Sequence, residues 1–174
     1  KEVNHSSGLR LNGALSIAQT DSRWQELKRQ ATTAQLYNVG INILNRDEIK
    51  DKYPMMQTKD LKGGVLMPGD GAADPSGVTY MLAKAARQGG AKIYEKSPVE
   101  KILTRNGRVY GVKVNGKEIK SEYIVLATGM WSRQIGNEIG VSIPLYPAEH
   151  FYVITEPIEN LPKTLPVIRD FDSS

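Results

Sequence analysis

Apolar and polar positions alternate along the chain in short, well-separated patterns. The stretch from Leu11 to Ala18 alternates loosely, which favours a β-strand. Apolar residues then recur at helical spacing from Trp24 to Leu36, and Thr20 or Asp21 precedes them as a candidate N-cap. A short apolar run at 41–44 predicts a further strand. These segments predict a scaffold of strands and helices.

Two further helix starts have specific signals. Asn45 followed by Glu48 forms a capping box for a short helix. Asp74 followed by Pro75 predicts a second helix, with the aspartate as N-cap and the proline at the first helical position. Its apolar stripe is expected to face inward and consists of Val78, Met81, Leu82 and Ala85.

From residue 99 the period changes to that of a β-meander. Asn106-Gly107 and Asn115-Gly116 separate three alternating runs, and Asn-Gly between such runs is the strongest short hairpin signal. The third run is expected to continue through residue 127. A strand is also expected at 91–95, a short helix from Trp131 to Ile139, and strand-like structure interrupted by prolines in the tail at 141–158.

Composition narrows the classes of protein to which the chain can belong. With 174 residues, 40% hydrophobic and 24% charged, the chain is one ordinary soluble domain or two small pieces. A net charge of +4, scattered along the sequence, argues against a nucleic-acid partner. There is no cysteine and there are only two histidines, so no metal site is expected. No apolar run reaches the roughly 18 residues that span a membrane, and a reducing, cytoplasmic location is expected.

The run Tyr123 to Ser132 is the first candidate for chemistry. Four large apolar residues lead into Ala127, Thr128 and Gly129, where backbone N–H groups lie free of bulky side chains. Such a turn suits a pyrophosphate or ribose, although a tight structural connection has the same pattern. The residues alone leave both interpretations open.

The order of the segments resembles a known family. The segment GGVLMPGDGAADPSGVTYMLAKAARQGGAKIYEKSPVEKI, followed by VLATGMWS, resembles the second half of the FAD-binding domain in D-amino-acid-oxidase-like flavoenzymes. PLYPAEHFYVITEPI and LPVIRDFD are more similar to the dimethylglycine and sarcosine dehydrogenase branch of that family. The similarity covers nearly all of the chain, which looks like an internal fragment because both of its ends look cut.

The resemblance implies a fold class and a division into domains. The expected class is mixed α/β: a partial Rossmann-like FAD-binding domain with a three-stranded meander, plus part of an antiparallel-sheet substrate domain. Residues 1–64 would belong to the substrate domain, 65–140 to the second half of the FAD-binding domain, and 141–174 would return into the substrate domain.

The resemblance also implies roles for individual residues. Val99 would hold the adenine through its backbone, although the pattern alone makes it an ordinary core valine. Ala127, Thr128 and Gly129 would line the sugar and phosphates of FAD. Trp131 would pack beside the cofactor or cap the helix start, and a core anchor is the alternative.

One part of the family pattern is missing. The family carries G-x-G-x-x-G after its first strand, and this chain has no such motif. Gly69 and Gly71 give only G-x-G, and we expect no strand before them. The 174 residues alone are therefore expected to bind FAD weakly or not at all.

His150 and Arg169 are the candidate substrate residues. A histidine can orient a carboxylate or transfer a proton, and His150 is also the one candidate for a catalytic role. Arginine can clamp a carboxylate with two hydrogen bonds. An ordinary strand histidine and a solvated arginine are the alternatives.

The expected function is that of the parent protein. It is FAD-dependent oxidation of the C–N bond of secondary or tertiary amines such as N-methylglycines, with the electron acceptor (oxygen or an electron-transfer protein) left open. A non-catalytic binding or regulatory subunit on the same scaffold is the alternative, and a free-standing interaction module is disfavoured. Open sheet edges and apolar faces make self-association of the 174 residues an expectation.

Overall fold

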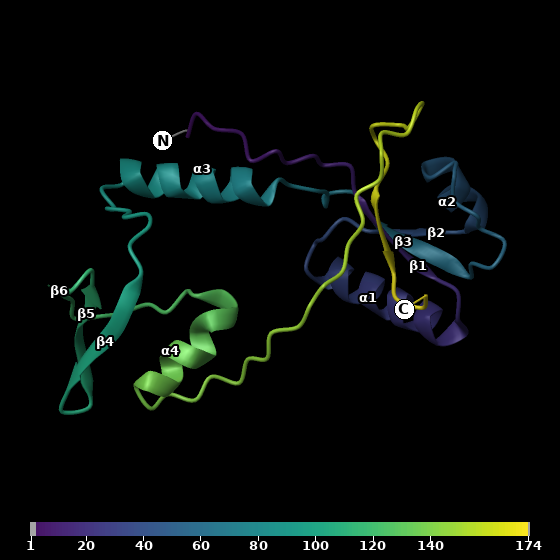
Figure 1. Cartoon of the computed structure of the whole chain (residues 1–174). Coiled ribbons are helices and arrows are strands. Elements are labelled where there is room, and N and C mark those ends of the chain that lie inside the picture. The colour runs from purple at the N-terminus through teal and green to yellow at the C-terminus, as the bar shows by residue number, and fades with distance from the viewer. Residues whose placement is uncertain (1–2, 174) are drawn as a thin grey trace. The chain divides into compact units, whose positions relative to one another are not determined.

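The computed structural model describes residues 3–173 and divides into two compact units (Figure 1). The larger unit comprises Lys1–Lys92 with Ile158–Ser174, and the smaller one comprises Ile93–Pro157. Helices and strands are mixed in both units, which confirms the predicted mixed α/β class. The domain division proposed from the sequence concerns a longer chain, and it stays a prediction.

A four-stranded sheet organises the larger unit, in the order β2-β3-β1-β7. Its strands are β1 (Ala14–Ala18), β2 (Asn42–Leu44), β3 (Gly63–Met67) and β7 (Val167–Asp170). The β1–β3 and β2–β3 pairs are antiparallel, whereas β7 runs parallel to β1. The central strand β1 therefore joins segments about 150 residues apart through one ladder, in which Leu15 lies opposite both Leu66 and Ile168.

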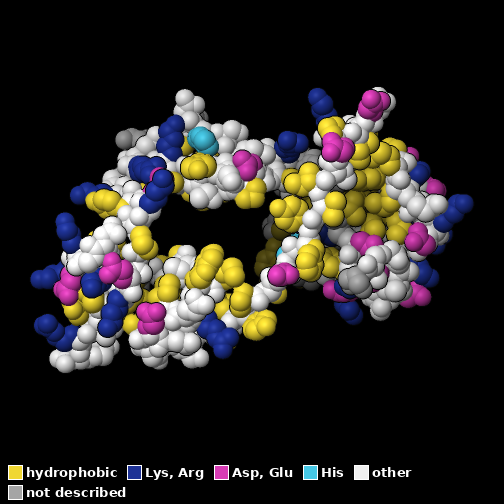
Figure 2. Space-filling view, viewed as in Figure 1, with side chains coloured by type: hydrophobic (Ala, Val, Ile, Leu, Met, Phe, Trp, Pro, Cys, Tyr) yellow, Lys and Arg dark blue, Asp and Glu magenta, His cyan; other side chains and the backbone are white. Residues whose placement is uncertain are grey.

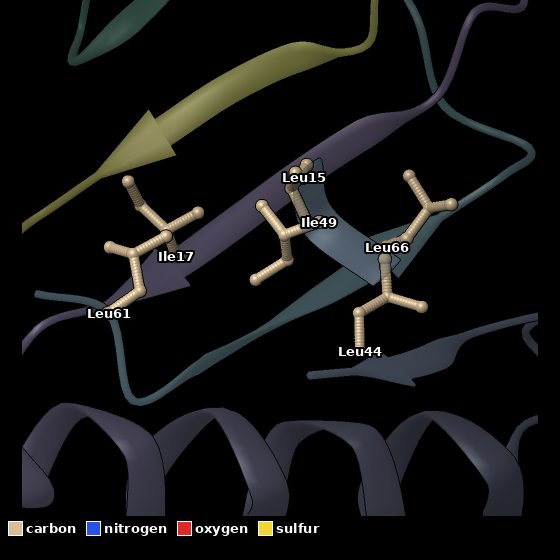
Figure 3. Close-up of a cluster of buried hydrophobic side chains, with 6 residues drawn as sticks. All are labelled: Leu15, Ile17, Leu44, Ile49, Leu61 and Leu66. Atoms are coloured by element: carbon tan, nitrogen blue, oxygen red, sulfur yellow. The ribbon is translucent and has the colours of Figure 1, made fainter. Parts of the chain in front are cut away.

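Helices cover the two faces of this sheet. Helix α1 (Asp21–Leu36) buries Leu27 and Ala31 against one face, and α2 (Arg46–Lys52) buries Ile49 against the other. Side chains on a strand alternate between faces, so the odd and even positions of β1 serve different cores. Figure 3 shows the core beside α2, which consists of Leu15, Ile17, Leu44, Ile49, Leu61 and Leu66.

The helix caps that the sequence predicts are confirmed. Thr20 accepts a hydrogen bond from the backbone of Arg23 at the start of α1. Asn45 and Glu48 form the complete capping box of α2. Asp74 caps α3 (Pro75–Gln88) through the backbone N–H of Ser76. Each cap satisfies a backbone donor that the first helical turn leaves without a partner.

The apolar stripe of α3 departs from its prediction. The stripe was expected to face inward, yet Leu82 is 59% exposed and Val78, Met81 and Ala85 are only partly buried. The reason is that few described residues pack on this side of α3, and its one buried position is Gly77 beside the backbone of Ser6.

The smaller unit contains the predicted meander. Strands β4 (Val99–Arg105), β5 (Arg108–Val114) and β6 (Lys117–Lys120) pair antiparallel in that order. Both Asn-Gly turns have positive φ at both residues, as a two-residue hairpin of this type requires. A 3₁₀ turn, η1 (Gly129–Trp131), leads into α4 (Ser132–Glu138), and Gly140, two residues after the helix, has the left-handed conformation.

Two predicted strands, and the second half of a third, are absent among the described residues. Residues 91–95 and 123–127 lack strand pairing, so the third strand of the meander ends at Lys120, and the tail at 141–158 is irregular. A strand needs a neighbour that takes up its backbone hydrogen bonds. Val125 is 89% exposed, because an apolar run without such a neighbour remains extended and open to solvent.

Asp172 fastens the segment after β7 to the start of α1. Its carboxylate accepts hydrogen bonds from the backbone N–H of Gln19 (2.9 Å) and Thr20 (3.3 Å) and from Nε of Arg23 (3.3 Å). The guanidinium of Arg23 also lies over the ring of Phe171, 5.3 Å from its centre. The Gln19 hydrogen bond, followed by those from Thr20 and Arg23, lowers the pKa of Asp172.

This lowered pKa predicts how the stability of the chain depends on pH. A carboxyl group whose pKa is lower in the folded state stabilises the fold above its unfolded pKa of about 4, and that contribution disappears as the pH falls through the folded pKa. We expect Asp172→Asn to destabilise the chain at pH 7, and the difference from wild type to shrink below about pH 4.

Urea unfolding at several pH values measures this difference. Asp60→Asn is the matched control, because Asp60 is exposed and has no ion pair among the described residues. If the loss of unfolding free energy in Asp172→Asn stayed constant down to pH 2.5, the contacts of Asp172 with the start of α1 would not depend on its charge.

Hydrophobic side chains lie open at the surface in many places (Figure 2). The run 151–154 contains four consecutive large apolar residues that are 86%, 80%, 89% and 83% exposed. It has no strand partner among the described residues, so its backbone groups are also free to pair. An unpaired apolar segment of this kind is a template for association.

We therefore expect the 174-residue chain to self-associate in solution through this run. Val153→Lys should weaken association at least about tenfold, because burying a charge costs more than burying a valine gains. Gln30→Lys adds the same charge on the exposed face of α1 and should have little effect. Sedimentation velocity over a range of concentrations measures both variants, and a wild-type chain that stays monomeric throughout contradicts the expectation.

Candidate functional site

The five residues predicted to contact FAD all lie in the smaller unit. Val99 opens β4 and is half exposed, so it is not the ordinary core valine that its pattern allowed. It lines a groove of about 540 Å³ whose other walls are Tyr94, Ser97, Val114, Asn115, Lys117, Glu118 and Ile119. Four of these eight lining residues are apolar and four are polar or charged, and such a mixture is compatible with a small-molecule groove.

The turn at 127–131 leaves backbone open to an incoming ligand. Gly129 has φ of 54°, and apart from its two chain neighbours no described residue has an atom within 4 Å of the position that a Cβ would occupy. The carbonyl of Thr128 accepts a hydrogen bond from the N–H of Trp131 (3.2 Å), and the Thr128 and Ser132 hydroxyls are 2.9 Å apart. The turn is therefore held in shape while the glycine itself stays uncovered.

Trp131 does not act as a core anchor in this structure. Its side chain is 59% exposed, whereas Ser132 next to it is buried. An exposed indole beside an open glycine can stack on a ligand or on a neighbouring segment, because both of its faces are large and apolar. The roles of Val99, Ala127, Thr128, Gly129 and Trp131 toward the cofactor stay predictions.

The residues present fit part of FAD but supply no phosphate cradle. Contrary to the prediction, a strand does precede Gly69 and Gly71, because β3 ends at Met67. A phosphate still cannot lie against Gly71, since a Cβ there would overlap the carbonyl oxygen of Arg10. Gly71 is needed for this close approach of two backbones, and Arg10 and Ala72 form a β-bridge beside it.

The two candidate substrate residues belong to different compact units. His150 lies in the irregular segment of the smaller unit and is exposed. Arg169 lies on β7 of the larger unit, where its Nη2 is 3.0 Å from Oδ2 of Asp70. Within residues 3–173, no group of three or more His, Cys, Asp or Glu side chains could hold a metal ion.

Asp70 is a residue whose role the sequence does not reveal. Its position before Gly71 indicates a turn, and that turn is present, but the partner Arg169 lies 99 residues away. The carbonyl of Asp70 accepts a hydrogen bond from the N–H of Gly13 (2.8 Å), and its Oδ1 accepts one from the N–H of Gly71 (2.8 Å). One aspartate therefore connects the loop after β3 to the start of β1 and to β7.

Gly71 gives a direct test of how tightly this loop is held. We expect Gly71→Ala to lower the free energy of unfolding by about 1–3 kcal/mol, because the backbone of Arg10 or of the loop must shift. Gly69→Ala is the matched control in the same loop, since its Cβ would meet no described atom within 4 Å. Chemical denaturation at low protein concentration measures both, and equal effects would show that the close approach does not restrain the loop.

Comparison with known proteins places the whole chain in one family. The model of the FAD dependent oxidoreductase (DAO) family matches residues 1–174. Sarcosine dehydrogenase from Homo sapiens is 35% identical over 100% of this chain and 20% of its own length. The pyruvate dehydrogenase phosphatase regulatory subunit from Mus musculus is 32% identical over 99% of this chain and 20% of its own length. Both relatives are described as mitochondrial, and this chain spans about a fifth of their length.

The fold agrees with that assignment. The crystal structure of L-proline dehydrogenase from P. horikoshii superposes with a TM-score of 0.86 at 29% identity, covering 94% of this chain and 44% of that one. No helix among residues 3–173 is long and apolar enough to cross a membrane. The resemblance to D-amino-acid-oxidase-like flavoenzymes is thus confirmed: the chain belongs to the family of FAD-dependent oxidoreductases, and it is related to sarcosine dehydrogenase.

Proposed function

We propose that the complete protein uses FAD to oxidise the C–N bond of secondary or tertiary amines such as N-methylglycines. The observation that carries the proposal is the match of all 174 residues to the family, together with 35% identity to a sarcosine dehydrogenase. When bound, FAD supplies the acceptor for a hydride from the carbon next to the amine nitrogen. The residues of this chain bind and orient the partners of that reaction.

The smaller unit supplies contacts for the cofactor in this proposal. Val99 is half exposed at a groove that suits a flat heterocycle, and it is paired with Val114 at the start of the β4–β5 ladder. The turn at Ala127, Thr128 and Gly129 lets a sugar or phosphate approach the backbone, because no side chain stands over Gly129. The exposed indole of Trp131, two residues further on, is the candidate to stack beside the cofactor. The phosphate cradle would come from chain beyond these residues.

The larger unit supplies a cation for the substrate. Arg169 on β7 is the candidate partner for the carboxylate of an N-methylglycine, and His150 is a second candidate that could orient the carboxylate or accept a proton. The expected cytoplasmic location stays a prediction, and both electron acceptors, oxygen and an electron-transfer protein, are compatible with this proposal.

A regulatory role is the second candidate, and one observation favours it. A relative that matches almost all of the chain is described as a regulatory subunit of a phosphatase. Such a protein would keep the scaffold without turning over an amine. The two functions differ in whether the complete protein reduces its flavin when an amine is added.

The test is anaerobic mixing of the complete flavoprotein with N-methylglycine while flavin absorbance is recorded. We expect bleaching of the oxidised flavin at a rate that saturates with the amine. Residues 1–174 alone serve as the control, and we expect them to bind FAD weakly or not at all because they hold no phosphate cradle. Bound flavin that no secondary or tertiary amine bleaches would refute the enzyme proposal, and a complete protein that binds no flavin would favour the regulatory one.

A further inference from the structure

Another groove lies at the end of the meander that is remote from Val99. Its volume is about 880 Å³, and it is lined by Gly107, Arg108, Val109, Tyr110, Lys120, Ser121, Glu122 and Tyr123. Val99 opens β4 and Arg105 closes it, and seven extended residues at about 3.3 Å each place the two ends roughly 20 Å apart. This hairpin-end groove is therefore separate from the groove at Val99.

Two arginines face each other beside the hairpin-end groove. Arg105 and Arg108 are direct partners in the β4–β5 ladder, so their side chains start from the same face of the sheet. Like charges in directly opposite positions destabilise a sheet. Among the described residues, neither guanidinium has a hydrogen bond or an ion pair, and Arg105 has only the ring of Tyr110, whose centre is 5.5 Å from its Cζ. Such an uncompensated departure from a local rule is typical of a functional site.

The charges around this groove are predominantly positive. Lys120 is exposed and has no ion pair among the described residues, and Glu122 is the one acidic residue of the eight that line the groove. Glu100, elsewhere on the meander, is engaged already, because it accepts a hydrogen bond from the N–H of Gly116 and lies 3.7 Å from Nζ of Lys113. Figure 2 shows Lys and Arg side chains gathered around the meander. The groove therefore attracts an anion.

The donors at the groove suit a phosphate group better than a carboxylate. Each guanidinium carries five N–H donors, and a single fork already matches the two oxygens of a carboxylate. Two forks on one face, with an ammonium group nearby, match a ligand that has more oxygens and more than one negative charge. A phosphate monoester has three terminal oxygens and a charge of about −1.5 to −2 at pH 7.

A phosphate group alone would leave most of the groove empty. Tyr123 lines the groove and is 79% exposed, and Tyr110 and Val109 line it as partly buried residues. Aromatic rings offer a flat apolar surface to an organic group that is joined to the phosphate. The lining thus matches a small phosphate ester with a flat or apolar organic part.

We propose that the hairpin-end groove binds a small organic phosphate, with Arg105, Arg108 and Lys120 at the phosphate and Tyr123 at the organic part. The bound dianion offsets the repulsion between the two arginines, so binding stabilises the β4–β5 hairpin. The inference goes beyond the proposed function and does not depend on it, because the ligand is not an amine and takes no part in reduction of the flavin.

Calorimetry on the complete protein in the presence of FAD tests the inference, with phenyl phosphate as the probe and no amine added. FAD keeps the probe from the cofactor contacts. We expect phenyl phosphate to bind and inorganic phosphate to bind about threefold to tenfold more weakly, because it lacks the contact with the ring. Phenol should not bind measurably, and added salt should weaken the binding of phenyl phosphate.

Substitutions identify the groove as the place of binding. We expect Arg105→Gln and Arg108→Gln each to weaken phenyl phosphate about tenfold to a hundredfold, because a charge-assisted contact is lost. Glu122→Gln should have the opposite sign and tighten binding about twofold to fivefold, because it removes a negative charge beside the phosphate. Arg133→Gln is the matched control, since it removes an exposed arginine of the same unit that does not line the groove, and it should leave the affinity unchanged.

Hydrogen exchange gives a second readout. Phenyl phosphate should slow exchange of the backbone amides of β4 and β5 beside the Asn106-Gly107 turn in wild type and not in Arg108→Gln. Neither arginine substitution should lower stability, because each removes one member of a repulsive pair, and circular dichroism checks that the variants are folded. Absence of binding, an affinity that neither arginine substitution lowers, or an equal loss in Arg133→Gln would each overturn the inference.

Discussion

The backbone ladder of β1 is the constraint on which the rest of the larger unit depends. This five-residue strand pairs with β3 on one side and with β7 on the other, so it unites positions near 15, 66 and 168. Because strand side chains alternate, the register that places Leu15 opposite Leu66 also places Ser16 opposite Arg169. A shift of one residue would move the core leucines to the wrong face and take the arginine away from Asp70.

Long-range polar contacts reinforce this ladder at both ends. At one end, Asp172 accepts hydrogen bonds from the start of α1. At the other, Asp70 accepts hydrogen bonds from Arg169 and from the backbone at the start of β1. Both carboxylates satisfy backbone N–H groups as well as an arginine, which makes them stronger restraints than exposed ion pairs alone.

The smaller unit contains two features of a candidate cofactor site, although the described residues supply no phosphate cradle. The groove at Val99 and the open turn at Gly129 are present although the chain carries no phosphate cradle. Each depends on local geometry: one on the start of a meander strand, the other on a glycine in the left-handed conformation. The chain belongs to a family of FAD-dependent oxidoreductases, and the proposed cofactor contacts fall on these two features.

The sequence by itself determined the helix caps and the hairpin turns, and the order of its segments indicated the family. The capping box at Asn45, the cap at Asp74 and the two Asn-Gly turns need only neighbours a few residues away, and all formed as expected. Tertiary structure alone decided which apolar runs became strands, because residues 123–127 have strand-like composition but no pairing partner. It also decided that Gly71 makes room for Arg10 and that Asp70 meets Arg169, since those contacts depend on the register of a ladder between distant segments.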